Sequence, residues 1–210
     1  MLSRRDCGDL LARADSIAAL SAITRAIGFV GTPDPLDRRT RRELGISDDC
    51  RRAWIQRRPG NGGGTLRALL LDVPGDRPLR DRLTRIAQRL SARGSPLLWF
   101  LCGAAPDTRH VALAAIDLAP PRPRVRALVS DCQRVTESDA DTLAALSASA
   151  GADDVATYAR WLEVLGREAV TRRFYLAVAR HVDVLADHAL GEGRASENTR
   201  HELALVYATR

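Results

Sequence analysis

Arginine and aromatic residues alternate along residues 158–182, in the stretch YARWLEVLGREAVTRRFYLAVARHV. Guanidinium groups suit phosphate because their planar fork of N–H donors matches its oxygens, whereas aromatic rings at helical spacing most often fill a core. The spacing predicts helices interrupted at Gly166, with buried rings and arginines on the outer faces. Those faces either follow DNA phosphates or are simply solvated. The candidates for contacts with the DNA backbone are Arg160, Arg167, Arg172, Arg173 and Arg180.

The sequence assigns no catalytic residue and no metal ligand. A nuclease of the PD-(D/E)xK type needs a lysine beside its metal-binding acids, yet all 32 basic residues are arginine. Asp72 and Asp117 are therefore interpreted as strand-end residues that face solvent. The histidines form no HExxH or HNH-like set, and no serine lies in a GxSxG turn. The glycine-rich turn and the NPPY-like tetrapeptide of an adenine methyltransferase are also missing, so no cofactor is expected in this chain.

Composition indicates a folded protein with a polyanionic partner. Hydrophobic residues make up 45% of the 210 residues and charged residues 28%, which is typical of a globular protein. The formal net charge of +6 favours nucleic acid, because basic groups gain affinity by releasing counterions from phosphates. The alternative is that the lysine-free, arginine-rich composition reflects a GC-rich genome.

Cysteine usage and hydropathy predict a cytoplasmic protein without a membrane segment. The four cysteines are far apart and form no CxxC pair, so neither disulfides nor a zinc site are expected. The N-terminus is charged where a signal peptide is apolar, and no apolar run reaches the roughly 18 residues of a membrane span.

The first 136 residues predict an α+β fold with a mostly antiparallel five-stranded sheet and packing helices. An amphipathic helix is expected from Asp9 to Ile27, and a short, exposed basic helix is expected between Asp37 and Gly45. The helix PLRDRLTRIAQRLSA, residues 78–92, should pack on the sheet by one apolar stripe, with its arginines mostly on the other side. The five strands are RRAWIQRRP, TLRALLLDV, PLLWFLCGA, HVALAAIDL and RVRALVSD.

The glycine-rich segment GNGGG joins the first two of these strands. Such a loop binds phosphate when it leads from a strand into a helix, but here it leads from strand to strand, so a plain hairpin is expected. Beyond Thr136 the composition shifts and no strand is predicted. The chain is therefore divided into an α+β domain, residues 1–136, and an all-helical segment, residues 137–210.

Two segments near the C-terminus resemble a known family. LGREAVTRRFY, residues 165–175, and RHELALVYATR, residues 200–210, are similar to the helical region ahead of the methyltransferase domain in type IIG restriction-modification proteins. In that family the two elements read like ITRRFY and ELALLLLNRLLFLYFL. The resemblance covers residues 158–210 well and the preceding α+β region only loosely.

The resemblance implies a position within a larger DNA-modifying protein. It suggests a non-catalytic N-terminal module or fragment of a restriction-modification or phage-defence adenine-specific DNA methyltransferase, which contributes DNA-backbone contacts and domain positioning. The expected partners are DNA and a methyltransferase domain or partner chain, and S-adenosylmethionine would bind only in that absent domain. Two alternatives remain open: a protein–protein adaptor module that uses its sheet edge, and a free-standing enzyme with an unrecognised site.

Overall fold

The computed structural model describes residues 2–59, 65–94, 97–118 and 123–167, together with the single positions 178, 181 and 184. The chain divides into two compact units, Met1–Glu168 and Ala169–Arg210. Nearly all described residues belong to the first unit. No helix among them is long and apolar enough to cross a membrane.

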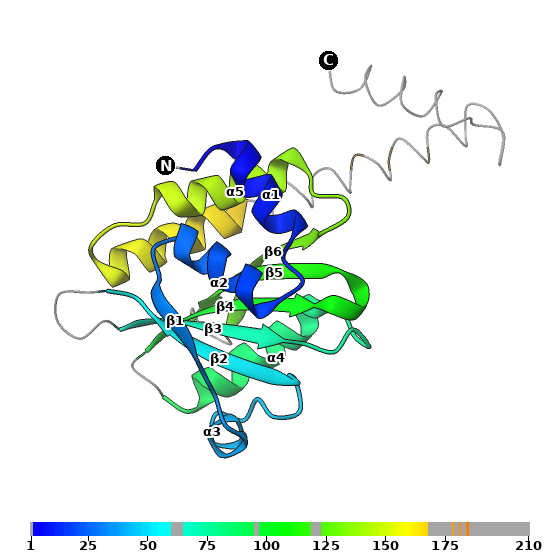
Figure 1. The fold of residues 1–210 in the computed structure, drawn as a ribbon. Helices are drawn as coiled ribbons and strands as arrows, with labels where there is room; N and C mark the ends of the chain where they lie inside the picture. Colours follow the sequence, from blue (N-terminus) through cyan, green and yellow to red (C-terminus); the bar gives the residue numbers. More distant parts are fainter. Residues whose placement is uncertain are drawn as a thin grey trace. The chain divides into compact units, whose positions relative to one another are not determined.

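The first unit is an α+β fold built on one mixed sheet (Figure 1). Its strands are β1 (Val30–Pro35), β2 (Arg52–Arg57), β3 (Leu66–Asp72), β4 (Leu98–Ala105), β5 (His110–Asp117) and β6 (Arg124–Asp131). Its helices are α1 (Arg4–Ala12), α2 (Ile17–Ala26), α3 (Arg38–Glu43), α4 (Leu79–Ala92) and α5 (Glu137–Ala148), followed by a helical segment over residues 154–167.

The strands lie in the sheet in the order in which they follow one another in the chain. β3 and β4 are parallel, since α4 crosses between them, and the other neighbouring pairs are antiparallel. The antiparallel pairing of β2 with β3 that the predicted hairpin requires, and the packing of the residue 78–92 helix on the sheet, are thus confirmed. The predicted count of five strands is wrong, because β1 adds a sixth at the edge.

Strand β1 contains two prolines, and no strand was predicted at its position in the sequence. Leu36 N donates to Ala53 O of β2 at 2.9 Å, so the alternation of a strand turns the backbone nitrogen of Pro35 away from β2. A proline at this position removes no hydrogen bond from the sheet, which is why an edge strand accepts it. Proline at this position also gives the outer edge no N–H donor for a further strand.

The prediction of a single amphipathic helix from Asp9 to Ile27 is also wrong, because the chain forms two helices there. α1 ends at Ala12, and Ser16 then caps α2 by accepting a hydrogen bond from Ala19 N at 3.3 Å. The apolar spacing continues across the break, and so periodicity alone could not reveal it. Ser16, a residue type that commonly caps helix N-termini, was the feature of the sequence that indicated a second helix.

Strand alternation divides the interior into two cores, one on each face of the sheet. On one face, α1, α2, α5 and residues 154–167 cover β-strand side chains such as Leu70, Phe100 and Leu113. On the other face, α4 covers Leu69, Leu101 and their neighbours. Because residues 137–167 pack into the first core, they belong to the same unit as the sheet, whereas the composition had placed a division at residue 136.

The aromatic residues of the segment 154–167 are core residues, as predicted. Trp161 is fully buried against Phe29 and Phe100, with ring centroids 5.9 Å and 4.8 Å away. The Tyr158 hydroxyl accepts from Ile116 N at 2.7 Å and donates to Trp99 O at 2.9 Å, which ties the ends of β4 and β5 together. Phe174 and the following predicted helices lie outside the described residues.

Candidate nucleic-acid interface

Two of the five predicted DNA-contacting arginines lie in the described part of the chain. Arg160 and Arg167 are exposed on residues 154–167, and their separation of seven residues places them on one side of the helix. Neither forms an ion pair with any residue that the structure describes. Arg172, Arg173 and Arg180 lie outside the described residues.

A second set of arginines lies along α4, on the opposite face of the sheet. Arg82, Arg85, Arg89 and Arg93 recur at spacings of three and four residues, so at 3.6 residues per turn they fall within a sector of about 80°. On the helix surface this sector lies next to the buried apolar residues of α4, and not on the opposite side of the helix. The prediction that the α4 arginines lie mostly on the side away from the sheet is therefore wrong for Arg82, whose side chain is buried.

A buried carboxylate provides the negative charge that allows the Arg82 side chain to be buried. Asp49, in the segment between α3 and β2, is only 1% exposed. Its Oδ2 lies 2.8 Å from Arg89 Nη1, and its Oδ1 lies 3.5 Å from Arg85 Nη2 and 3.7 Å from Arg82 Nη1. Arg82 also pairs with Asp76. One buried carboxylate thus lies within ion-pair distance of three guanidiniums, while the hydrogen bonds of Arg82 and Arg89 go to Asp76 and to the backbone oxygens of Asp48 and Gly45.

Two of these three guanidiniums are still accessible. The side chains of Arg85 and Arg89 are 36% and 39% exposed, against 5% for Arg82. A guanidinium carries five N–H donors, and one carboxylate cannot satisfy them all. Asp49 therefore orients side chains whose remaining donors can bind an incoming anion.

Gly45 makes room for the arginine at the end of α4. Its φ of +70° ends α3 in the left-handed region, and its carbonyl oxygen accepts from Arg89 Nη1 at 2.7 Å. The Arg93 guanidinium stands where a Cβ at Gly45 would project. Gly45, Asp48, Arg89, Ala92 and Arg93 line an open hollow of about 480 Å³.

The short helix α3 adds four more arginines beside this hollow, in the order RRTRRE, and it confirms the predicted basic helix. Asp37 caps the helix by accepting from Thr40 N at 2.6 Å, and this hydrogen bond lowers the pKa of the Asp37 carboxyl. Arg41 Nη1 donates to Arg51 O at 2.6 Å and so fastens α3 to the start of β2.

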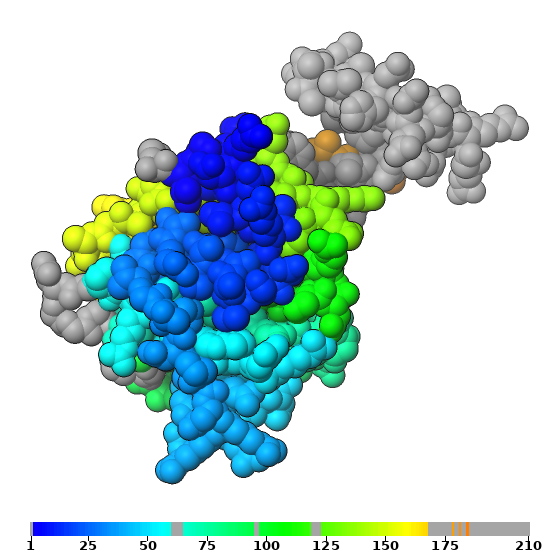
Figure 2. Space-filling view, viewed as in Figure 1, coloured from blue at the N-terminus to red at the C-terminus, as the bar shows by residue number. Residues whose placement is uncertain are grey.

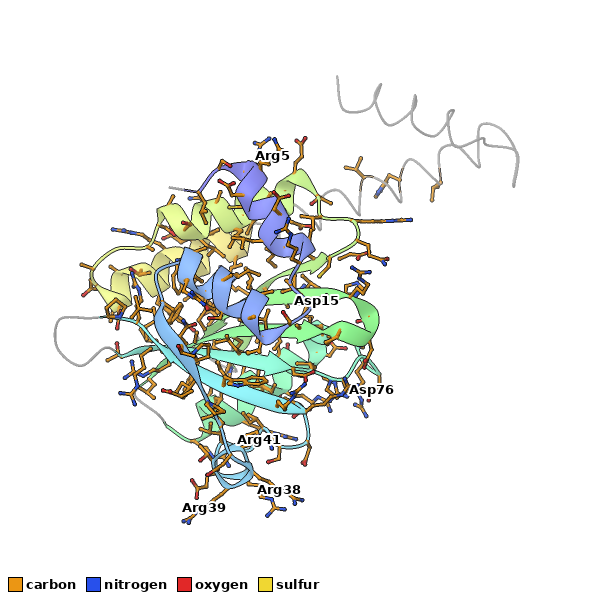
Figure 3. The ribbon with its side chains drawn as sticks, in the orientation of Figure 1. Arg5, Asp15, Arg38, Arg39, Arg41 and Asp76 are labelled. Carbon is orange, nitrogen blue, oxygen red and sulfur yellow. The ribbon has the colours of Figure 1, made fainter. Side chains whose placement is uncertain are left out.

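The outer arginines of α3 point away from the body of the unit. Figure 3 shows Arg38 and Arg39 projecting from the helix, and Figure 2 shows the same segment protruding from the surface. Arg39 pairs with Glu43 at 2.8 Å, but both side chains are well exposed, so the pair is weak. Arg38 and Arg42 form no ion pair within the described part of the chain.

We call these eight residues of α3 and α4 the arginine surface: Arg38, Arg39, Arg41, Arg42, Arg82, Arg85, Arg89 and Arg93. Residues 37–49 and 76–93, which carry them, hold ten arginines and six carboxylates in all. The excess of four positive charges is most of the net charge of +6. The basic character of the chain is therefore concentrated here.

Asp72 and Asp117 end β3 and β5, as predicted, but their side chains are largely covered. The side chains of Asp72 and Asp117 are only 16% and 15% exposed, and each has an arginine close by. Asp72 Oδ2 lies 3.2 Å from Arg52 Nε, and Asp117 Oδ2 lies 2.7 Å from Arg126 Nη2. The prediction that they face solvent is wrong because neighbouring strands supply these counterions across the sheet.

Among the described residues, no three His, Cys, Asp or Glu side chains gather as a metal site. The four cysteines are free and buried, and burial raises the pKa of each thiol. The arrangement offers positive charge and hydrogen-bond donors, and Asp49 is the element that sequence reasoning missed.

No protein-family model, curated protein or solved structure matches this chain. The site must therefore be interpreted from its own geometry.

Proposed function

We propose that the chain binds the sugar–phosphate backbone of DNA through the arginine surface, as a non-catalytic module of a restriction-modification or phage-defence protein. The observation that carries the proposal is the buried Asp49 carboxylate, which aligns the guanidiniums of Arg82, Arg85 and Arg89 on one side of α4. The resemblance of residues 158–210 to type IIG restriction-modification proteins supports DNA as the polyanion.

The dimensions of the surface suit a phosphate track. From Arg85, the first accessible arginine of α4, to Arg93 the helix rises about 12 Å, which is roughly the rise of three to four nucleotides along one DNA strand. Guanidiniums held by a fixed counterion lose less side-chain freedom on binding than free ones, and arginine forks match phosphate oxygens. Such contacts position a protein on a duplex without reading its sequence.

Arg160 and Arg167 were the DNA-contact candidates predicted from the sequence, and they lie on a different surface from the arginine surface. They lie on the helix that covers the other face of the sheet, so one straight duplex cannot contact both surfaces equally. Among the residues that the structure describes, no buried acid forms an ion pair with either of them. We therefore assign the main contacts to α3 and α4.

The test is a salt titration of duplex affinity. Replacing Arg38 and Arg42 by alanine together should lower the magnitude of the slope of log affinity against log salt by up to about two, or roughly 0.9 for each lost phosphate contact, equally for unrelated sequences. The double variant Arg5→Ala, Arg13→Ala is the matched control, because it removes two exposed charges from α1 and its C-cap on the opposite face. Equal slopes for both variants, or no duplex binding by the native chain, would favour the adaptor function instead.

A further inference from the structure

Two arginines stand directly opposite each other at one end of the paired strands β2 and β3. Arg57, the last residue of β2, is the cross-strand partner of Arg67 in β3. Directly opposite residues project from the same face of a sheet, so the two positive charges are neighbours. Like charges in this position destabilise a sheet. The pair therefore weakens the free fold instead of holding it together.

The pair lies on the face of the sheet that α4 covers. Along β3, Arg67 projects from the same face as Leu69, which belongs to the core beneath α4. In β4 the neighbour of Arg67 is Trp99, which lines a hollow together with Leu90 of the last turn of α4. Arg93, a member of the arginine surface, follows that turn as the C-cap of α4. The pair thus shares the face of the arginine surface and lies at the end of the sheet where α4 ends.

Two other strand arginines have an acid opposite them. Arg52 is in register with Asp72, and its Nε lies 3.2 Å from Asp72 Oδ2. Arg124 stands opposite Asp117 in the β5–β6 pair. These pairs place opposite charges across the sheet, which stabilises it. The arrangement at Arg57 is the reverse.

The protein supplies no counterion to Arg57 among the residues that the structure describes. Arg57 is exposed, and it forms no ion pair with any of these residues. In Arg67, Nη1 donates to Leu66 O at 3.1 Å, a backbone oxygen that carries no full charge. The positive charge of Arg57 is therefore available to an external anion.

We infer that Arg57 and Arg67 together bind one phosphate group. The Cβ atoms of directly opposite residues are about 4.5–5.5 Å apart, so two guanidinium forks on flexible side chains reach the oxygens of the same phosphate. The planar fork of each guanidinium matches the geometry of those oxygens. The negative charge of the phosphate attracts both arginines and so offsets the repulsion between them. A bound phosphate thus turns a destabilising pair into a stabilised site.

The phosphate can belong to the DNA backbone or to a free phosphate ligand. The first assignment rests on the proposed function, and it lengthens the phosphate track of the arginine surface on the same face of the sheet. The groups that recognise the phosphate are the same in both cases. Two arms of one experiment separate the two sources.

The first arm measures the salt dependence of duplex affinity for Arg57→Gln, Arg67→Gln and the double variant. Each single variant keeps one guanidinium on a shared phosphate, so we expect a weaker affinity with a slope close to the native one. The double variant loses the contact and should lower the magnitude of the log–log slope by about 0.9, the value for one phosphate. Arg124→Gln removes an exposed arginine from the edge strand β6 and is the matched control, with native affinity and slope.

The second arm measures the thermal unfolding midpoint in sodium phosphate and in sodium chloride of equal ionic strength. Phosphate salts stabilise folded proteins in general, and this effect is common to all variants. Loss of binding at the pair removes only the additional stabilisation that a bound ligand gives. A smaller rise in phosphate for the double variant than for Arg124→Gln, together with native duplex slopes, assigns the pair to a free phosphate.

The charge pattern gives a further readout in the free protein. At low salt, Arg57→Gln should raise the urea midpoint because it removes the repulsion, whereas Arg124→Gln should lower it because it removes an attraction to Asp117. Both shifts should shrink in about 1 M salt, where the Debye length is about 3 Å. A lower midpoint for Arg57→Gln would show that the pair holds the fold together and would contradict the inference.

The outcomes also separate this inference from the proposed function. A native slope for the double variant Arg38→Ala, Arg42→Ala would count against the proposed function only, and if the native chain binds no duplex, the phosphate arm decides. A variant lacking both Arg57 and Arg67 that matches Arg124→Gln in both arms would overturn the inference. A loss of about 0.9 in slope for each single variant would also overturn it, because it means two separate phosphates.

Discussion

The two faces of the sheet contain buried charges that are balanced in different ways. On the face covered by residues 154–167, the pair Arg58–Asp154 is closed: its side chains are 6% and 9% exposed, with Arg58 Nη1 3.4 Å from Asp154 Oδ1. Asp154 Oδ2 also accepts from Leu66 N at 3.0 Å, and Arg58 lies over the Trp161 ring. One cation meets one anion there, and little capacity for a ligand remains.

On the face covered by α4, the cluster around Asp49 is open. Three guanidiniums meet one carboxylate, and two of the three are partly exposed. The closed pair fixes where a helix sits, whereas the open cluster also retains donors at the surface. The comparison shows that burial of a charge alone does not indicate function, and that the unbalanced charge is the more informative feature.

The closed pair should carry the largest stability effect. Asp154→Ala leaves Arg58 buried without its counterion and removes the acceptor for Leu66 N, so the free energy of unfolding should fall by roughly 3–5 kcal/mol. The neighbouring Asp153→Ala loses only an exposed cap on Ala156 N, 2.6 Å away, and should cost about 1 kcal/mol. Urea unfolding measures both, and equal losses would show that the buried pair is not special.

The thiol at the edge of the open cluster predicts a response to alkaline pH. Burial raises the pKa of Cys50 from 9.0 to about 11, so between these values the unfolded chain releases a proton that the folded chain retains. Stability from this group is therefore complete below pH 9 and is lost as pH rises to 11, by roughly 2–3 kcal/mol.

Cys50→Ala should remove this part of the pH dependence. Unfolding free energies of the native protein and of Cys50→Ala at pH 8.5 and pH 11 would measure the change. An identical loss between the two pH values in native protein and Cys50→Ala would contradict the assignment.

The open cluster should lose less stability than the closed pair although its carboxylate is more deeply buried. In Asp49→Ala, Arg85 and Arg89 can turn to water and Arg82 keeps Asp76, so we expect a loss of about 1–3 kcal/mol. Chemical denaturation of Asp49→Ala and Asp154→Ala under one set of conditions compares the two. A larger loss for Asp49→Ala would mean that the cluster is chiefly structural.

The periodic elements of the fold could be predicted from the sequence because burial imposes their spacing. β2 to β6 and α4 each bury an apolar pattern of the appropriate period, and their order follows from short connections. β1 was missed because proline is rare inside strands and Pro35 also suits the start of the following helix. The break before Ser16 was missed because the apolar spacing continues across it.

The candidate site was less predictable because it depends on contacts between distant segments. Asp49 and Arg89 are 40 positions apart, and nothing local to either residue indicates that they meet. Arg82 looked like a surface residue for the same reason, since its buried counterion comes from another segment. The charge excess was visible from composition, but its location on α3 and α4 required the fold.

The most direct test of the central claim compares the salt dependence of duplex binding for two double variants. Arg38→Ala, Arg42→Ala removes two charges from the arginine surface, and Arg160→Ala, Arg167→Ala removes two from the helix on the other face. We predict that the first lowers the magnitude of the log–log slope by up to about two and that the second leaves it unchanged. A reduced slope for the Arg160 and Arg167 variant with a native slope for the Arg38 and Arg42 variant would contradict the account.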